Sequence, residues 1–139
     1  MNTPITFQIA KLLKEKEFNE NCSDYYTALG NLNSNGWGDI IYEQGFGSGE
    51  PERMLSFNYS DFNKHQKETC FLCPTISDVI MWIYNKHGIW IWVERYSTLF
   101  RPYAEEIGDK RFGKWEGYKF NSPTEAYLAA IEYTLKILI

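Results

Sequence analysis

The sequence contains few residues of the types that form catalytic and metal sites. Its 139 residues include only three cysteines and two histidines. Neither His65 nor His87 has a neighbouring serine and carboxylate in the pattern of a catalytic triad. The carboxylates are scattered singly, and we interpret the adjacent Glu105 and Glu106 as a solvated turn, not as an acid/base pair. The sequence therefore gives no positive case for an enzyme, and we expect neither catalytic residues nor a cofactor.

Long hydrophobic runs are also missing. The longest, Val79–Tyr84 and Ile89–Val93, are far shorter than the roughly 20 residues that span a bilayer. The opening MNTPITFQIAKLL has no basic stretch followed by an unbroken apolar one, which a secretory signal needs. A small, odd number of cysteines suits a reducing compartment better than a disulfide framework. We expect a cytoplasmic protein without a membrane segment.

Positive charge is in the minority. Fourteen Lys and Arg stand against 18 Asp and Glu, and the net charge is -4. Such a balance favours solubility and weakens the attraction to phosphate backbones and anionic membranes. Gly45, Gly47 and Gly49 do not predict a phosphate-binding loop, because no GK[ST] follows them and no helix is expected there.

Cys70 and Cys73 form the only spacing in the chain that is typical of a metal site, CxxC. Such a pair supplies half of a tetrahedral zinc site, which His65, Cys22 or His87 would have to complete. The ligand set is incomplete, since no second CxxC and no HxxxH is present. A redox pair is the other use of this spacing, but both thiols precede the expected helix start and no βαβ unit surrounds them. We favour two semi-buried thiols in a loop, with zinc at Cys70, Cys73 and His65 as the alternative.

The first half of the chain is predicted to form one helix and a meander. Thr3 and Pro4 have the residue types of a helix N-cap and first turn, and apolar residues recur at helical spacing to about Lys16. Turn formers punctuate the segment that follows. Within it, Asp39–Glu43 and Met54–Tyr59 are the expected strands, joined as a hairpin by a glycine-rich loop.

The second half begins with a clear helix signal. Thr75, followed three residues later by Asp78, is typical of a capped N-terminus. The apolar spacing predicts a helix over about Ile76–Lys86, and Gly88 is placed to end it.

The residues that follow, IWIWVERY, alternate between the two faces of a strand. We expect the face of Ile89, Ile91 and Val93 to lie under the helices, which turns Trp90 and Trp92 outward. The expected partner strands are Ser97–Tyr103 and Lys114–Phe120, with the charged loop Glu105–Arg111 between them.

A last helix is predicted to start at Ser122 and Pro123, which supply an N-cap and a first-turn proline. Its apolar stripe runs almost to the C-terminus. Helix, meander, helix, meander, helix is an α+β order. We expect a single domain over residues 1–139, with a first part (1–62) of helix and meander and a second (63–139) of helix, strands and helix. An antiparallel sheet should carry the three helices mainly on one face.

Three strings cover much of the chain: FQIAKLLKEKEFNENCSDYY near the start, PTISDVIMWIYNKHGIWIWV in the middle and SPTEAYLAAIEYTLKIL at the end. Together they resemble small uncharacterised proteins of Bacteroides-type bacteria and of their phages and mobile elements. The shared motifs are structural. The resemblance implies an accessory protein of a mobile element and brings no activity with it.

Aromatic residues are unusually abundant, at 17% of the chain. If no other segment covers the outward tryptophans, they belong to an apolar patch of the kind that a monomer rarely leaves unused. The candidate binding residues are Trp90, Trp92, Tyr96, Arg95, Arg101 and Trp115.

These rings could serve as a cover for the sheet, close a homodimer or bind a foreign protein. We predict a non-enzymatic interaction protein that binds a protein partner or a second copy there. Single-stranded nucleic acid, which stacks on rings beside cations, is the alternative that the acidic balance disfavours.

Overall fold

The computed structural model describes residues 3–33, 56–64, 70–106 and 119–139. The contacts divide the chain into two compact units. Thr6–Pro74 form the N-terminal unit, and Thr75–Ile139 together with Met1–Ile5 form what we call the helix–hairpin unit. The predicted class is confirmed, because antiparallel sheets of three and two strands occur with N-terminal, central and C-terminal helices packed on them. The single domain stays a prediction.

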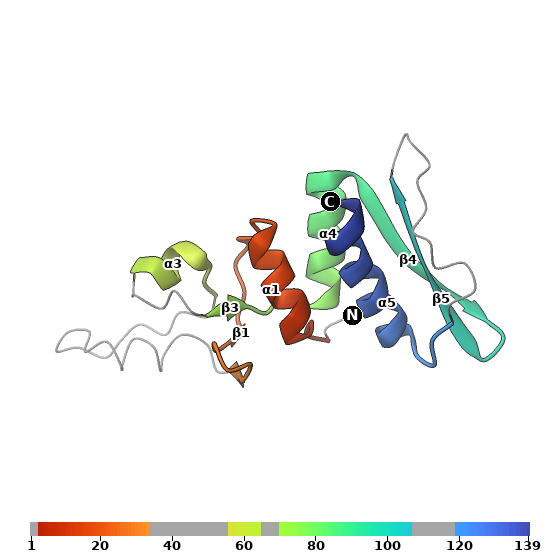
Figure 1. The fold of residues 1–139 in the computed structure, drawn as a ribbon, viewed down its shortest axis with the longest axis horizontal. Coiled ribbons are helices and arrows are strands. Elements are labelled where there is room, and N and C mark those ends of the chain that lie inside the picture. Colours follow the sequence, from red (N-terminus) through yellow and green to blue (C-terminus); the bar gives the residue numbers. More distant parts are fainter. Residues whose placement is uncertain (1–2, 34–55, 65–69, 107–118) are drawn as a thin grey trace. The chain divides into compact units, whose positions relative to one another are not determined.

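In the N-terminal unit, a three-stranded antiparallel sheet is accompanied by two helices (Figure 1). β1 (Tyr25–Tyr26) is the middle strand, with β2 (Leu32–Asn33) on one side and β3 (Phe71–Leu72) on the other. The helices are α1 (Phe7–Glu15), which packs on β3, and the short α3 (Tyr59–Lys64). Both edges of the middle strand are therefore used.

α1 begins later than the sequence predicts. Thr6 is its N-cap, and the side-chain oxygen of Thr6 accepts a hydrogen bond from the amide of Ile9 (3.2 Å). Thr3 and Pro4 lie before the helix, where the carbonyl oxygen of Thr3 accepts a hydrogen bond from the amide of Ile76 (2.9 Å). The predicted cap was wrong because these first residues pair within the helix–hairpin unit, a long-range contact that local residue types do not reveal.

Aromatic rings fill the core of the N-terminal unit. Phe57 and Phe62 are fully buried and meet edge to face, with their ring centroids 5.1 Å apart. The ring of Tyr25 packs against both, at 5.5 Å and 5.7 Å. Phe57 is fixed by a backbone bridge to Cys22, with hydrogen bonds of 2.8 and 2.9 Å. These rings are core and not surface.

The predicted hairpin of the first half needs a correction where it is described. Tyr59 begins α3 and does not end a strand, because Asn58 and Asp61 cap that helix reciprocally. The amide of Asn58 donates to the Asp61 carboxylate (2.9 Å), and the amide of Asp61 donates to the side-chain oxygen of Asn58 (3.3 Å). Asp39–Glu43 and the start of Met54–Tyr59 lie outside the described residues.

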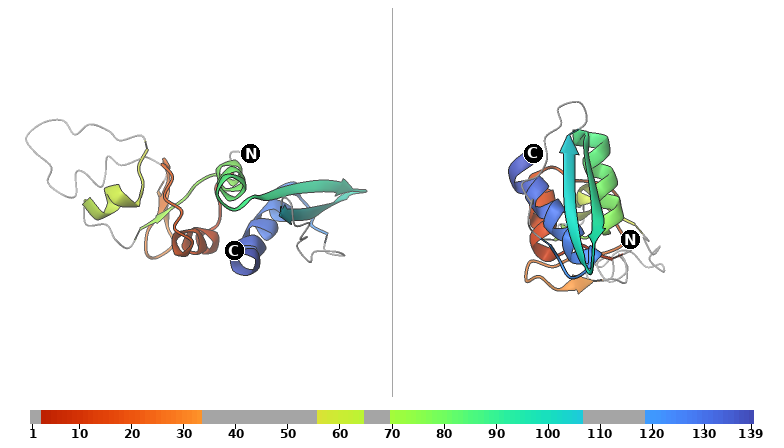
Figure 2. Two further views of the ribbon diagram at one scale, coloured as in Figure 1. Left: turned by 90° about the horizontal axis from the view of Figure 1, so that it is seen from above. Right: turned by 90° about the vertical axis from the view of Figure 1, so that its right-hand side faces the viewer.

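In the helix–hairpin unit, two helices pack on one face of a two-stranded antiparallel sheet. Both helices lie on the same side of the hairpin, as Figures 1 and 2 show. The elements are α4 (Ile76–His87), β4 (Ile89–Tyr96), β5 (Leu99–Glu106), α5 (Pro123–Tyr133) and a final π-type turn, η1 (Thr134–Leu138).

The sequence predicts the ends of these helices well. The Thr75 hydroxyl oxygen accepts a hydrogen bond from the amide of Asp78 (3.3 Å), and that of Ser122 accepts one from the amide of Glu125 (3.2 Å). Gly88 ends α4 with a φ of 69°, a left-handed conformation that glycine adopts without strain. The chain can thus turn directly from α4 into β4.

Alternation along the hairpin decides which side chains are buried. Ile89, Ile91 and Ala104 are buried on the face that carries α4 and α5. The C-terminal segment closes this core, since Ile131 and Leu135 are fully buried. The predicted inward direction is therefore confirmed for Ile89 and Ile91, whereas Val93 on the same face is half-buried. In the part of the chain that the structure describes, no helix is long and apolar enough to cross a membrane.

The second strand of the hairpin starts and ends later than predicted. Ser97 and Thr98 form the turn, with Ser97 at a φ of 61°, so β5 begins at Leu99. Glu105 and Glu106 belong to β5, where they pair with the start of β4, and not to a solvated loop. The rest of the predicted loop lies outside the described residues, as does most of the predicted strand Lys114–Phe120.

Candidate functional site

The face of the hairpin opposite the helices is the candidate functional site. In the β4–β5 register, Trp90 lies opposite Glu105 and Trp92 lies opposite Tyr103. Residues directly opposite each other on antiparallel strands have their side chains on the same face of the sheet. Because side chains alternate along a strand, Trp90 and Trp92 lie on the face opposite to that of Ile89. We call it the outer face; its residues are Trp90, Trp92, Glu94, Tyr96, Leu99, Arg101, Tyr103 and Glu105.

Aromatic rings run along the outer face. Trp90 is 41% exposed and meets Tyr84 of α4 edge to face, with ring centroids 5.3 Å apart. Trp92 stacks on Tyr103 at 5.0 Å, with an angle of 12° between the ring planes. Tyr96 is 54% exposed near the turn. These contacts hold the rings in fixed orientations while leaving ring surface open to solvent.

Charged groups lie among these rings. The indole N–H of Trp92 donates to the Glu94 carboxylate (3.3 Å). The Arg101 guanidinium carbon lies 5.0 Å from the centroid of the Tyr96 ring, and the Lys119 ammonium nitrogen lies 4.2 Å from it. The Nε atom of Arg101 is buried and has no hydrogen-bond partner among the described residues. Two cations, Arg101 and Lys119, therefore lie beside the Tyr96 ring near the turn, and the Nε–H of Arg101 has no acceptor in the part of the chain that the structure describes.

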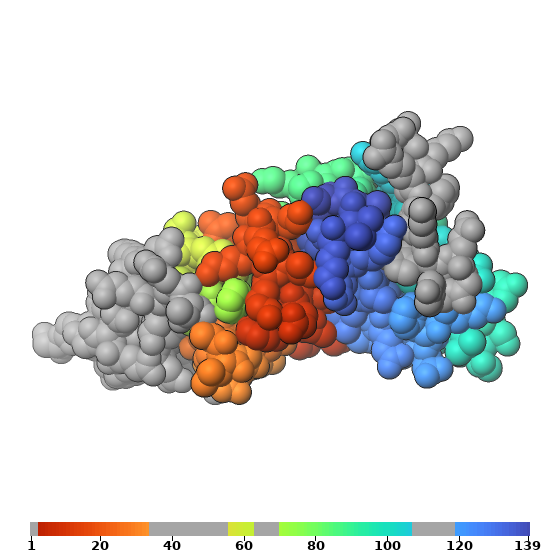
Figure 3. Space-filling model, viewed as in Figure 1, coloured from red at the N-terminus to blue at the C-terminus, as the bar shows by residue number. Residues whose placement is uncertain are grey.

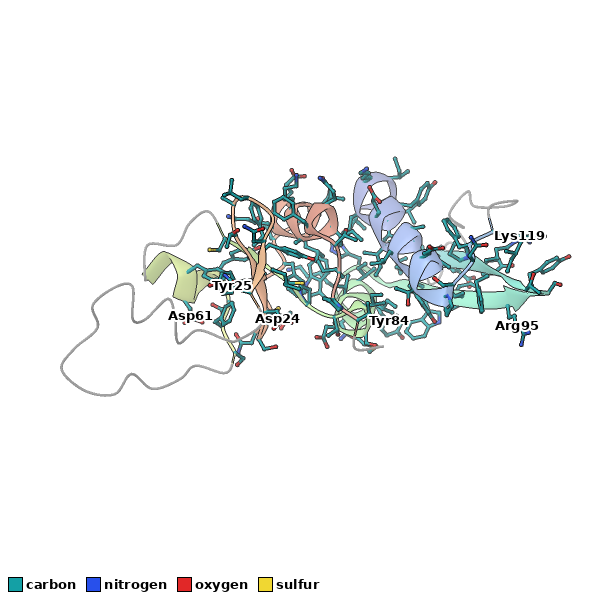
Figure 4. The ribbon with its side chains drawn as sticks, turned by 90° about the horizontal axis from the view of Figure 1, so that it is seen from below. Asp24, Tyr25, Asp61, Tyr84, Arg95 and Lys119 are labelled. Carbon is teal, nitrogen blue, oxygen red and sulfur yellow. The ribbon has the colours of Figure 1, made fainter. Side chains whose placement is uncertain are left out.

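In the space-filling view, the turn of the β4–β5 hairpin and the segment leading into α5 lie next to each other on the surface (Figure 3). The side-chain view places Arg95 and Lys119 at opposite sides of the hairpin (Figure 4). This agrees with the pairing of Phe120, next to Lys119, with Phe100 on the far side of β5.

Four of the six predicted binding residues meet on the outer face: Trp90, Trp92, Tyr96 and Arg101. Arg95 is exposed but alternates to the other face, and its Nε donates to the carbonyl oxygen of Ser97 (3.0 Å). Trp115 lies outside the described residues. The structure therefore assembles most of the predicted site and separates Arg95 from it.

Several residues of the site were missed by the sequence prediction, among them Tyr103, Tyr84 and Lys119. Tyr103 follows from the register once the turn at Ser97 is known, because pairing back from that turn brings it opposite Trp92. Tyr84 carries no such signal, since it lies on a helix and reaches Trp90 only through the tight connection after α4. Lys119 carries no such signal either, because its contact with Tyr96 depends on the tertiary fold.

The three cysteines are buried in the N-terminal unit. The amide of Cys73 donates to the carbonyl oxygen of Asp24 (3.0 Å), and Cys22 pairs with Phe57. No three His, Cys, Asp or Glu residues within the described ranges are grouped so as to hold a metal ion. His65 lies outside those ranges, so the zinc alternative at Cys70, Cys73 and His65 stays a prediction.

Two tyrosines near these thiols are held in the neutral form. Burial raises the pKa of Tyr26 to about 12, and the nearby Cys73 thiol adds to the rise. Burial also raises the pKa of Tyr59. The hydroxyl oxygen of Tyr59 accepts a hydrogen bond from the amide of Leu72 (3.0 Å), which opposes that rise. A phenol used as an acid or base near neutral pH needs the opposite shift, so these tyrosines fit a structural role.

A scan of protein-family models and searches of curated proteins and of solved structures found no match to this chain. The chemistry available at the outer face is therefore judged from its own groups. They are indole and phenol rings, two carboxylates, a guanidinium and, beside them, an ammonium. Such groups bind through apolar contact, stacking and charge-assisted hydrogen bonds.

Proposed function

We propose that the protein is a non-enzymatic accessory module that binds a protein partner through the outer face. The observation that supports this most is the exposure of Trp90 and Tyr96 in fixed orientations, beside a sheet face whose isoleucines are completely buried. Tryptophan and tyrosine are enriched at protein interfaces because each buries a large apolar area at a small cost in side-chain entropy. A rigid aromatic face of this kind suits a binding role.

The partner surface that fits best has an apolar centre and an acidic group at one end. The apolar centre would cover Trp90 and Trp92, which lie toward the start of β4. The acidic group would face Arg101 and Lys119, the two cations beside the Tyr96 ring.

The biological setting is part of the proposal. The three strings that resemble proteins of Bacteroides-type bacteria and their phages support an accessory role in a mobile element. Action in the cytoplasm is part of the same proposal, supported by the small, odd number of cysteines, which suits a reducing compartment. The partner is then a protein of the host cell or of the element itself.

Affinity capture followed by a purified titration tests the proposed function. A tagged chain is used to capture partners from a lysate of the source organism, and the partner found is then purified. Trp90→Ala should weaken its binding by about 30-fold or more, because a truncated aromatic anchor costs about 2 kcal/mol or more at an interface. Met81→Ala is the matched control, since Met81 is an exposed apolar residue of the same unit (46%) on α4. Equal affinities for the wild type and Trp90→Ala would remove the site.

Single-stranded nucleic acid is the second candidate ligand, favoured by the two cations beside Tyr96. Bases stack on exposed rings while Lys and Arg contact the phosphates. This function predicts binding of a single-stranded oligonucleotide at low salt that weakens steeply as salt rises, and a smaller salt dependence for Lys119→Ala. The absence of any binding at low salt would exclude it.

A further inference from the structure

We propose that the edge of β4 that β5 does not occupy pairs with the β4 strand of a second copy of this chain. The two hairpins would then form one continuous antiparallel sheet of four strands. This goes beyond the proposed function and does not depend on it, because it uses backbone groups at the edge of the sheet and not the outer face.

The backbone bridge between Phe100 and Phe120 shows which amide and carbonyl groups of β4 point toward this edge. The amide of Phe100 donates to the carbonyl oxygen of Phe120, and the amide of Phe120 donates to that of Phe100, both at 2.8 Å. Phe100 therefore turns its backbone groups away from β4. Its cross-strand partner Arg95 must turn its own groups away from β5, because hydrogen-bonded and non-hydrogen-bonded pairs alternate in an antiparallel ladder.

The same alternation extends along the whole of β4. Ile89, Ile91, Val93 and Arg95 all direct their amide and carbonyl groups toward the side of β4 that β5 does not occupy. Among the residues that the structure describes, β5 is the only strand that pairs with β4. An eight-residue strand rich in Ile, Val and Trp with an unpaired edge is a template for another strand.

The two edges of the hairpin differ in a way that favours β4. On β5, the residues whose backbone groups point away from β4 include Phe100 and Pro102. Phe100 is already paired with Phe120, and Pro102 has no amide hydrogen. Proline on an edge strand prevents pairing with another chain. β4 contains no proline. The edge that is open to pairing is therefore the edge that carries IWIWVERY.

A second copy fits this edge because β4 is complementary to itself. A two-fold axis perpendicular to the sheet keeps each face continuous, so a residue can oppose only residues of its own face. With the axis at Ile91, Ile89 lies opposite the partner subunit's Val93, and Trp90 lies opposite the partner subunit's Trp92. Apolar residues then meet apolar residues on the helix face and rings meet rings on the outer face. No charged pair falls within the five-residue overlap Ile89–Val93.

The molar mass in solution tests the dimer. Sedimentation equilibrium over a range of concentrations should reach twice the 16.4 kDa chain mass. Val93→Pro removes an edge amide without removing a β4–β5 hydrogen bond, since Val93 lies opposite Pro102 in a non-hydrogen-bonded pair. Val93→Ala is the control that shortens the side chain but keeps the amide. We expect the wild type and Val93→Ala to dimerise and Val93→Pro to stay monomeric. A monomeric wild type, or a folded Val93→Pro that dimerises equally, would overturn the proposal.

Amide hydrogen exchange of the unmodified chain gives a test that needs no variant. The amides of Ile91 and Val93 should exchange slowly at high protein concentration and faster on dilution, whereas the amide of Trp92, bonded within the hairpin, should be protected at both. Rates at Ile91 and Val93 that do not change with concentration would overturn the dimer. That result would leave partner binding by Trp90 untouched, so the two proposals fail separately.

Discussion

The N-terminal unit and the helix–hairpin unit use their sheets in opposite ways. In the N-terminal unit the strands are two residues long, the middle strand is paired on both sides, and the rings of Tyr25, Phe57 and Phe62 form the core. In the helix–hairpin unit the strands are eight residues long and the isoleucines of β4 face the helices, whereas Trp90 and Trp92 lie on the opposite face. Trp82 of α4 is buried. The rings around Phe57 thus serve stability in the N-terminal unit, and the rings of the hairpin's outer face present a surface.

The largest effect should come from removing a core ring of the N-terminal unit. Phe57 is fully buried, and Phe57→Ala would leave a cavity between Tyr25 and Phe62. We expect a loss of about 3–5 kcal/mol in the free energy of unfolding. Chemical denaturation followed by circular dichroism measures it. A loss below about 1 kcal/mol would mean that these rings are not the core.

A smaller effect should follow from removing one hydroxyl in the same unit. Tyr59→Phe deletes the acceptor for the buried amide of Leu72 and should cost about 1–3 kcal/mol at neutral pH. The pKa of Tyr59 is raised in the folded state, so its neutral form stabilises the fold fully below pH about 10. That contribution is lost as pH rises above this value. Wild-type stability should therefore fall above pH 10 more steeply than that of Tyr59→Phe. Parallel curves would contradict the assigned burial.

In the helix–hairpin unit, a helix cap should have an effect of about 1 kcal/mol. Ser122→Ala removes the oxygen that accepts the amide hydrogen of Glu125 at the start of α5. Ser122→Asp is the matched control, because aspartate can accept the same hydrogen bond. Thermal unfolding should rank the wild type and Ser122→Asp together and Ser122→Ala below them. Three equal midpoints would show that the cap is not needed once α5 is docked.

The smallest effect on stability should come from the outer face. Trp90 is partly exposed, and its ring meets that of Tyr84 on α4 edge to face. Trp90→Ala should therefore lower the free energy of unfolding by about 1 kcal/mol or less, as is usual for surface positions. The same denaturation experiment as for Phe57→Ala measures the difference. A loss comparable with that of Phe57→Ala would place Trp90 in a core and break the comparison.

Local signals in the sequence were enough for the helix ends at Thr75, Gly88 and Ser122 in the helix–hairpin unit. Thr75, Ser122 and Gly88 act within one turn of the helices that they cap, so their effect can be read from neighbouring residues. Thr3 was misread because its carbonyl oxygen bonds Ile76, which is far away in the sequence. Glu105 was misread for a similar reason, because a charged residue enters a strand only when the partner strand continues beside it.

The candidate site could be predicted in part for the same reason. Alternation along IWIWVERY is local, and it correctly directs Ile89 and Ile91 toward the helices and Trp90 away from them. The partners of the tryptophans are not local. Tyr103 depends on the register that the Ser97 turn sets, and Lys119 reaches Tyr96 through the folded chain. The sequence alone therefore indicates which face of the strand is exposed, but it does not indicate which residues from other segments lie beside the tryptophans.

Hydroxyl-radical footprinting of the dilute, intact chain, read out by mass spectrometry, tests the central claim most directly. It compares the oxidation rates of Trp90 and Tyr96 on the outer face with that of Tyr25 in the core of the N-terminal unit. We predict that Trp90 and Tyr96, which are about half exposed, are only partly protected relative to the unfolded chain, and that Tyr25 is protected by about tenfold or more, since its side chain is almost completely removed from water. Protection of Trp90 equal to that of Tyr25 would mean that another part of the chain covers the outer face, and it would contradict the proposed binding role.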